Sequence, residues 1–244
     1  MSNMEETQFS RTELIYGAQG LSRLARSRVA VFGVGGVGGY VVEALARSGV
    51  GALDLIDADR VCLSNLNRQI IATHATLGMR KVDAARERVL SICPDCVVRT
   101  YPVFYLPDTA GQFDFTQYDY VVDAIDTVTG KIALVEQATA AGTPILCAMG
   151  AGNKTDPTAF RVADLSKTSM DPLARVMRKE LGKRGIRHIK VVYSVEPPLT
   201  PKGEPQPGRK QVPGSNAFVP AAAGLAIAAE VVRELTGFTD ERVW

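Results

Sequence analysis

The sequence predicts an α/β fold, with a doubly wound, mostly parallel, Rossmann-like sheet and a smaller C-terminal extension of the sheet. Short, continuously apolar segments alternate with segments of helical periodicity, as in a parallel sheet covered by helices on both faces. A glycine-rich turn follows the first apolar segment, and acidic residues end the second. With 244 residues, the chain can hold one sizeable domain and an appended lobe.

The individual elements follow from apolar spacing and from the residues that end each segment. Gly49 ends one helix, and Asp171-Pro172 is suited to begin another. The expected helices are residues 9–27 (interrupted by glycines at 17 and 20), 40–48, 77–92, 129–141, 171–181 and 218–235. The expected strands are residues 29–32, 52–56, 97–101, 120–125, 144–148 and 190–195.

The second half of the chain is less regular. Residues 196–214 hold six prolines and three basic residues and predict an exposed loop. The final helix is too apolar for a free surface, so we expect it to pack on the sheet or on a second subunit. Its apolar run is interrupted by Pro220 and is shorter than the roughly 20 residues that a membrane span needs.

The glycine turn predicts a nucleotide site. Gly33, Gly35 and Gly38 have the G-x-G-x-x-G spacing, between a strand and a helix, that lets a backbone and a helix N-terminus approach phosphate. Asp57 follows Gly38 by nineteen residues, at the end of the second strand, where a carboxylate can accept hydrogen bonds from ribose. These residues alone fit NAD and ATP equally well.

A polar cluster favours ATP. It comprises Asn65, Asn67, Arg68 and Gln69 in one loop, Lys81 thirteen residues after Arg68, and Asp126 at the end of a later strand. Cations can neutralise a triphosphate and stabilise a pyrophosphate leaving group, and a carboxylate with phosphate oxygens can hold Mg²⁺. A nicotinamide enzyme, the alternative reading, would need a general acid or base, whereas His74 and His188 lie in no catalytic context.

These residues together resemble the ubiquitin-activating-enzyme superfamily, including its bacterial ThiF and MoeB members. The matching segments are Gly33-Val-Gly35-Gly36-Val-Gly38, Asp57 with Asp59, residues 64–69, Lys81 and residues 123–126. The resemblance covers residues 9–150 and implies MgATP-dependent adenylation of a carboxylate. It implies catalytic roles for Arg11, Asn67, Arg68, Gln69, Lys81 and Asp126. It implies nucleotide contacts from Gly33, Gly35, Gly36, Gly38, Asp57, Asp59, Asn65, Asn67, Arg68, Lys81, Asp126 and Thr127, with Mg²⁺ on Asp126.

In this superfamily, the arginine that matches Arg11 reaches the partner subunit's ATP, which implies a homodimer. We therefore expect residues 1–27 to contribute across the dimer. Residues 28–150 would form the ATP-binding adenylation domain, and residues 151–244 a substrate-binding lobe packed on the same sheet.

The cysteines narrow the choice of substrate. From residue 148 onwards the chain has no cysteine, and Cys147 and Cys62 are interpreted as structural, so a thioester relay is not expected. The pair Cys93 and Cys96 lacks the further ligands of a zinc site. Four cysteines form no disulfide scaffold, and the N-terminus has no signal-peptide pattern, so we expect a cytoplasmic protein.

The second half resembles the tRNA threonylcarbamoyladenosine dehydratases. The similar segments are residues 150–152, 155–158, 164–168, 171–173, 193–196 and 214–220. This resemblance implies that ATP adenylates the threonyl carboxylate on a tRNA adenosine, and that ring closure within the substrate expels AMP. The alternative is adenylation of the C-terminus of a sulfur-carrier protein. The sequence leaves open whether a monovalent cation is bound and whether a sulfur-transfer protein is a partner.

Residues 161–190 carry nine Lys and Arg against three acidic residues, a local net charge of +6. This segment could bind tRNA phosphates in a sequence-independent, salt-sensitive way, or it could be a solvated helix face. The predicted basic patch comprises Arg175, Arg178, Lys179, Lys183, Arg184, Arg187 and Lys190.

Overall fold

The computed structural model describes residues 6–202 and 212–239. Its strands form one sheet in the order β3-β2-β1-β4-β5-β7-β6, in which β6 runs antiparallel to β7 and the other neighbours are parallel. The strands are β1 (Arg28–Phe32), β2 (Ala52–Ile56), β3 (Val97–Tyr101), β4 (Tyr120–Asp123), β5 (Ile145–Ala148), β6 (Phe160–Asp164) and β7 (Lys190–Ser194). The predicted doubly wound fold is confirmed.

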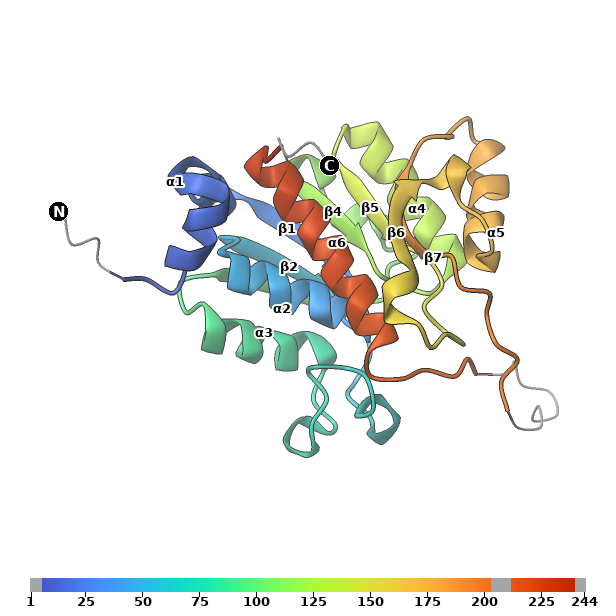
Figure 1. Ribbon diagram of the computed structural model, residues 1–244, viewed down its shortest axis with the longest axis horizontal. Helices are drawn as coiled ribbons and strands as arrows, with labels where there is room; N and C mark the ends of the chain where they lie inside the picture. Colours follow the sequence, from blue (N-terminus) through green and yellow to red (C-terminus); the bar gives the residue numbers. More distant parts are fainter. Residues whose placement is uncertain (1–5, 203–211, 240–244) are drawn as a thin grey trace.

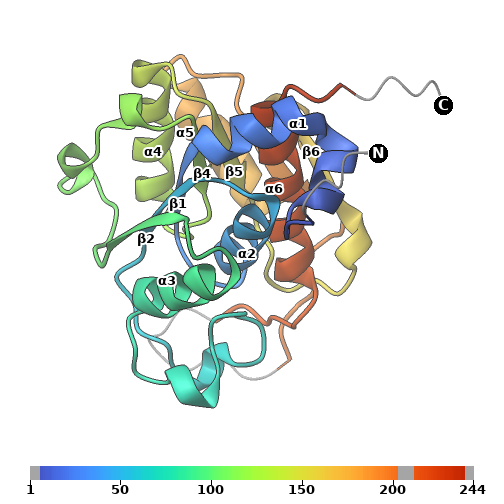
Figure 2. The ribbon, with the colours of Figure 1, turned by 90° about the vertical axis from the view of Figure 1, so that its left-hand side faces the viewer.

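Helices cover both faces of this sheet. They are α1 (Ser10–Arg26), α2 (Gly38–Ser48), α3 (Lys81–Ile92), α4 (Val128–Ala141), α5 (Pro172–Gly182) and α6 (Val219–Thr236). The helices α1, α2, α3 and α6 lie on the face nearest the viewer in Figure 1, and α4 and α5 pack together on the other. Figure 2 shows the layers from the side.

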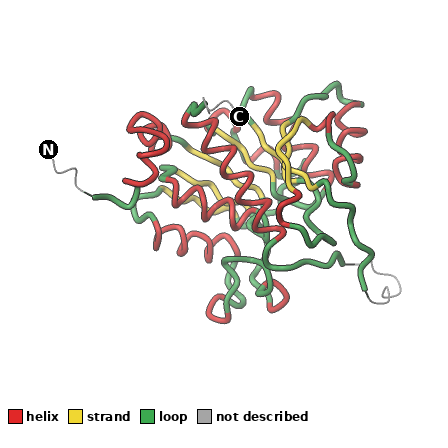
Figure 3. Tube along the Cα trace, viewed as in Figure 1, coloured by secondary structure: helices red, strands yellow, loops and turns green. Residues whose placement is uncertain are grey.

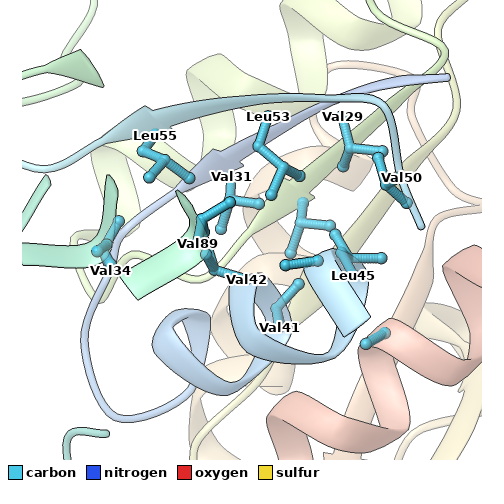
Figure 4. Close-up of a cluster of buried hydrophobic side chains, with 14 of the residues drawn as sticks. Val29, Val31, Val34, Val41, Val42, Leu45, Val50, Leu53, Leu55 and Val89 are labelled. Atoms are coloured by element: carbon cyan, nitrogen blue, oxygen red, sulfur yellow. The ribbon is translucent and has the colours of Figure 1, made fainter. Parts of the chain in front are cut away.

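The inner strands of the sheet are buried on both faces because they lie between two helical layers. Val29 and Val31 of β1 point toward α2, where they pack with Val41 and Leu45 (Figure 4). The alternate residue Phe32 points the other way, into an aromatic cluster under α4. Burial of such side chains stabilises the fold by roughly 1.5–3 kcal/mol each. This explains why the strands are continuously apolar.

Several element boundaries differ from the sequence-based prediction. The strand β6 was not predicted, because residues 160–164 are mostly half-exposed at the sheet edge. The helix α3 begins at Lys81, four residues later than predicted. The residues before it cannot be helical, because residue 80 forms an isolated β-bridge with Arg60 and because Gly78 has a φ of +83°. As predicted, α1 is interrupted at Gly17, whose backbone is not helical, whereas the interruption predicted at Gly20 is wrong because Gly20 is helical and packs against Thr236.

Long loops gather at one end of the sheet. The loops after β2 and β7 both leave carboxyl ends of strands, and in Figure 3 they extend from the lower side of the molecule. Part of the predicted loop at 196–214, namely residues 203–211, lies outside the described residues. Within the described ranges, no helix is both long and apolar enough to cross a membrane.

Candidate active site

The glycine turn lies at the point where the strand order reverses. The strand β1 pairs with β2 on one side and β4 on the other, and in such sheets a ligand binds outside the carboxyl ends at this point. At Gly33, where φ is +91°, a Cβ would fall 2.6 Å from the Ala124 carbonyl oxygen. At Gly38 a Cβ would fall 1.8 Å from the Gly33 carbonyl oxygen. Only glycine fits either position.

Gly35 has a different role from these two glycines. The nearest atom to a Cβ at Gly35 would be the Gln69 Nε2, 3.8 Å away, so the backbone there faces open space. The helix α2 begins directly afterwards, and its first N–H groups carry a partial positive charge. The turn is therefore a cradle that fits phosphate.

An acidic pair and a buried lysine lie beside the cradle. Asp57 accepts hydrogen bonds from the backbone N–H of Val34 (2.8 Å) and of Asp59 (2.9 Å), which fix it against the glycine turn. Lys81 is only 6% exposed, and its ammonium lies 2.7 Å from Asp59 Oδ2 and 3.8 Å from Asp57 Oδ2. The three predicted residues are therefore brought together.

The predicted Asn/Arg/Gln loop lies over the same turn. Asn65 is buried and accepts a hydrogen bond from the Cys62 N–H, which fixes the start of the loop. Arg68 donates to the Ser64 carbonyl (2.8 Å) and to Asn67 Oδ1 (2.9 Å). Its Cγ would lie 3.5 Å from a Cβ at Gly36. The structure thus places a guanidinium stem directly against the cradle.

Gln69 provides an independent sign of a ligand. It is 6% exposed, and its Oε1 is the one buried side-chain polar atom of the described residues without a hydrogen-bond partner. Such an unpaired group costs roughly 1–3 kcal/mol. A bound nucleotide, whose ribose carries hydroxyl donors, could satisfy this acceptor, so the residues present fit ATP.

Asp126 and Thr127 complete the carboxyl side of the cradle. Both are exposed, between Ala124, which contacts Gly33, and the start of α4. In residues 6–202 and 212–239, no cluster of three or more His, Cys, Asp or Glu could hold a metal ion. One carboxylate with phosphate oxygens is a common Mg²⁺ arrangement, so Asp126 fits an ion that arrives with a nucleotide.

Arg11 lies far from the cradle of its own chain. Neighbouring Phe9 packs at the C-terminal end of α2, where its ring is 3.3 Å from the Cβ position of Gly49. The cradle lies at the other end of this 11-residue helix, about 16 Å away at 1.5 Å per residue. The structure therefore does not bring Arg11 to the other predicted site residues.

Two buried lysines near the site were not predicted. Lys131 is fully buried and donates to both carboxylate oxygens of Asp123 (2.9 Å each) and to the Ala148 carbonyl (2.8 Å). Burial raises the pKa of Asp123, and Lys131 opposes this effect. Lys154 is 3% exposed and pairs with Asp171. The sequence signal for Lys131 was a single cation among the buried positions of an apolar helix.

Most of the predicted basic patch has partners inside the molecule. Arg178 donates to the Thr168 carbonyl and hydroxyl, Lys183 pairs with Glu180, and Arg184 pairs with Glu136 and Glu180. Lys190 pairs with Glu230 and Glu234. In the part of the chain that the structure describes, Arg175, Lys179 and Arg187 form no ion pair and are exposed.

The cysteines differ in exposure. Cys147 is fully buried at the end of β5, and burial raises the pKa of its thiol well above the ordinary value. Burial likewise raises the pKa of Cys96 to about 12. Cys62 is exposed, with its sulfur 3.3 Å from the Ser64 hydroxyl. A buried, protonated thiol such as that of Cys147 is a poor nucleophile.

The chain is similar to known proteins over nearly its whole length. The sequence pattern of the ThiF family matches residues 8–243. The tRNA threonylcarbamoyladenosine dehydratase of Bacillus subtilis is 45% identical over 242 residues, covering 93% of this chain and 94% of its own. The crystal structure of Escherichia coli tRNA N6-threonylcarbamoyladenosine dehydratase, TcdA, in complex with ATP superimposes with a TM-score of 0.85 at 35% identity, covering 94% of each chain. An adenylyltransferase and sulfurtransferase of Vanderwaltozyma polyspora is 34% identical and covers 63% of this chain and 36% of its own.

Proposed function

The chain belongs to the ThiF family, and we propose that it catalyses the ATP-dependent cyclisation of threonylcarbamoyladenosine in tRNA. One observation carries this proposal: Asn67 Nδ2 donates to the Ser215 carbonyl at 3.1 Å. This bond joins the loop over the phosphate cradle to a C-terminal segment that resembles the tRNA dehydratases. Likeness to these enzymes extends over nearly the whole chain, whereas the sulfurtransferase covers a smaller part, which favours the tRNA reaction over the sulfur-carrier alternative.

The chemistry needs no nucleophile from the protein. A carboxylate oxygen of the threonyl group attacks the α-phosphorus of ATP, and pyrophosphate leaves. A nucleophile within the same substrate then attacks the acyl carbon and loses its proton, and AMP leaves, so that the tRNA loses one water. Arg68 and Lys81 would stabilise the charge on the phosphates, and Asp57 would hold the ribose. The buried, protonated Cys147 is consistent with a reaction without a thioester.

We assign the nucleotide contacts to the glycine turn and to the side chains beside it. Asp126 would hold Mg²⁺ together with phosphate oxygens, and the ion would neutralise phosphate charge. Residues 28–150 supply these groups, and residues 151–244 supply the substrate side. A cytoplasmic location agrees with tRNA as the substrate. The atoms of the reaction balance without a monovalent cation or a sulfur-transfer protein, so we assign no step to either.

We further propose a homodimer in which Arg11 serves the partner's site. Its distance from its own cradle supports this arrangement, as do exposed apolar side chains on α1 and α6, two helices that contact each other near Thr236 (Figures 1 and 2). Leu14 (85% exposed) and Ile15 (62%) lie on α1, Leu225 (49%) lies on α6, and Phe218 (53%) directly precedes α6. Large apolar side chains exposed in this way favour association with another protein surface.

Mass spectrometry of the substrate nucleosides tests the function. The protein is incubated with ATP, Mg²⁺ and tRNA that bears threonylcarbamoyladenosine, and the modified nucleoside should lose the mass of one water. Matched tRNA without the threonylcarbamoyl group should support no pyrophosphate release. An unchanged mass with ATP-binding protein would contradict the proposal. Pyrophosphate exchange that depends on a carrier protein ending in Gly-Gly, and not on tRNA, would favour the alternative.

A further inference from the structure

Lys154 lies at the centre of a buried polar network on the substrate side. Its ammonium donates to the Gly150 carbonyl (2.6 Å) and to Asp171 Oδ2 (3.3 Å). The same Asp171 oxygen accepts the Gly150 N–H (3.0 Å), and the other caps α5 through the Ala174 N–H (2.9 Å). Because Lys154 and Asp171 are each 3% exposed, neither charge is solvated, and each depends on the other.

This network also holds the N-terminal end of α6. Asn216 Nδ2 donates to the Lys154 carbonyl (2.8 Å), and its Oδ1 accepts the N–H groups of Phe218 (3.2 Å) and Val219 (2.9 Å). The ends of α5 and α6, which are far apart in the sequence, are therefore fixed to one loop, residues 150–154. We call this arrangement the Lys154 clamp.

The clamp adjoins the nucleotide site without being part of it. The loop at residues 150–154 follows β5. The neighbouring strand β4 leads to Asp126. A nucleotide at the crevice between β1 and β4 leaves the carboxyl ends of β4 and β5 for the second ligand. The connection to the nucleotide side runs through Ser215, the residue before Asn216. The Ser215 carbonyl accepts a hydrogen bond from Asn67.

We propose that Lys154 is a positioning residue that holds the 150–154 loop and the starts of α5 and α6 where they receive the RNA-borne carboxylate. This inference rests on the proposed tRNA reaction. Lys154 is too buried to contact the RNA, so it acts through the loop. It differs from Lys131, which ties Asp123 and the turn before Asp126 to β5 and so supports the nucleotide side.

The variant Lys154→Met tests the clamp. Its cyclisation kcat should fall by roughly tenfold to a hundredfold because the reacting groups lose their alignment, while the ATP Kd from titration calorimetry stays within about twofold. The double variant Lys154→Met/Asp171→Asn removes the unpaired carboxylate and keeps the α5 cap. The double variant should recover thermal stability, while its cyclisation kcat should remain low. It serves as the test if the single variant fails to fold.

The matched control is Asp54→Asn, which breaks the ion pair (2.6 Å) between buried Asp54, in the middle of β2, and Arg28, at the amino end of β1, the end away from the cradle. It should lose stability and keep its cyclisation kcat. Wild-type cyclisation of the modified tRNA is measured first, and its failure would overturn the proposed function itself. With active wild type, normal kcat in the double variant, or an equal loss of ATP affinity and kcat, would overturn the role of Lys154 alone.

Discussion

At the glycine turn, individual atoms limit what the backbone can do. A methyl group at Gly38 would collide with the Gly33 carbonyl, and one at Gly33 would collide with the Ala124 carbonyl, so either would displace the turn. Arg68 contributes charge instead of shape. Two hydrogen bonds fix its guanidinium beside the cradle, so the side chain has already lost its conformational entropy before the nucleotide binds. Preorganised cations of this kind act on the charge that develops during reaction.

Arg68→Ala should therefore impair chemistry more than binding. We expect adenylation to fall by roughly 10²–10³-fold, while ATP affinity is only partly reduced because the glycine turn remains. Pyrophosphate exchange and ATP titration measure the two effects. Arg60→Ala is the control: its exposed guanidinium binds the Gly78 carbonyl and not the cradle. Full adenylation activity in Arg68→Ala would refute the assignment of this loop.

Residues that are close in sequence could be predicted as site residues, and residues paired over a distance could not. The segments at 33–38, 57–59 and 64–69 each carry their own spacing signal. Lys154 does not, because its role depends on Asp171 and Asn216, which only the tertiary structure brings near. The same holds for the basic patch, where Arg184 pairs with Glu136 on α4 and Lys190 pairs with Glu230 on α6.

At the scale of elements, α6 presses directly on the helix that begins at the cradle. Pro220 lies 3.3 Å from the Cβ position of Gly36, and a Cβ at Gly224 would meet the Val37 carbonyl oxygen at 2.4 Å. The sequence predicted this apolar helix and its burial. It could not specify the contact with α2, because the two partners are nearly two hundred residues apart. Through these contacts, the position of α6 determines where the glycine turn and the start of α2 lie.

Gly224→Ala should displace α2 and with it the glycine turn. We expect the free energy of unfolding to fall by about 1–3 kcal/mol, as for other overpacked sites, and ATP affinity to weaken. Chemical denaturation and ATP titration provide both values. Gly182→Ala is the matched control, because nothing lies within 4 Å of its Cβ position and its stability should change little. If ATP affinity were the same in both variants, α6 would not set the geometry of the cradle.

At the scale of the whole molecule, the cations of α5 lie apart from the proposed dimer contacts. They face solvent on the side of the sheet away from α1 and α6, whereas the exposed Leu14 and Ile15 lie on α1 and the exposed Leu225 lies on α6. A dimer through α1 and α6 would leave the α5 cations free for RNA. Within the described residues, Arg175, Lys179 and Arg187 are the members of the predicted basic patch that form neither an ion pair nor a side-chain hydrogen bond.

The double variant Arg175→Ala/Lys179→Ala should weaken tRNA binding to a similar extent for every tRNA sequence. The slope of log K against log salt should fall by about 1–2, since two phosphate contacts are lost. Filter binding over a salt series measures it. Lys183→Ala/Arg184→Ala removes the same charge from residues that already pair with Glu136 and Glu180, so its slope should change less. Equal changes in the two variants would place the RNA elsewhere.

The dimer proposal makes a sharper prediction, because each site would combine Arg68 of one chain with Arg11 of the other. Arg11→Ala and Arg68→Ala should each be nearly inactive alone. After subunit exchange of an equal mixture, half of the dimers carry one intact site, so activity should return to about one quarter of wild type. Cyclisation of modified tRNA measures this recovery. If Arg11 acted within its own chain, no dimer would hold an intact site and mixing would restore nothing.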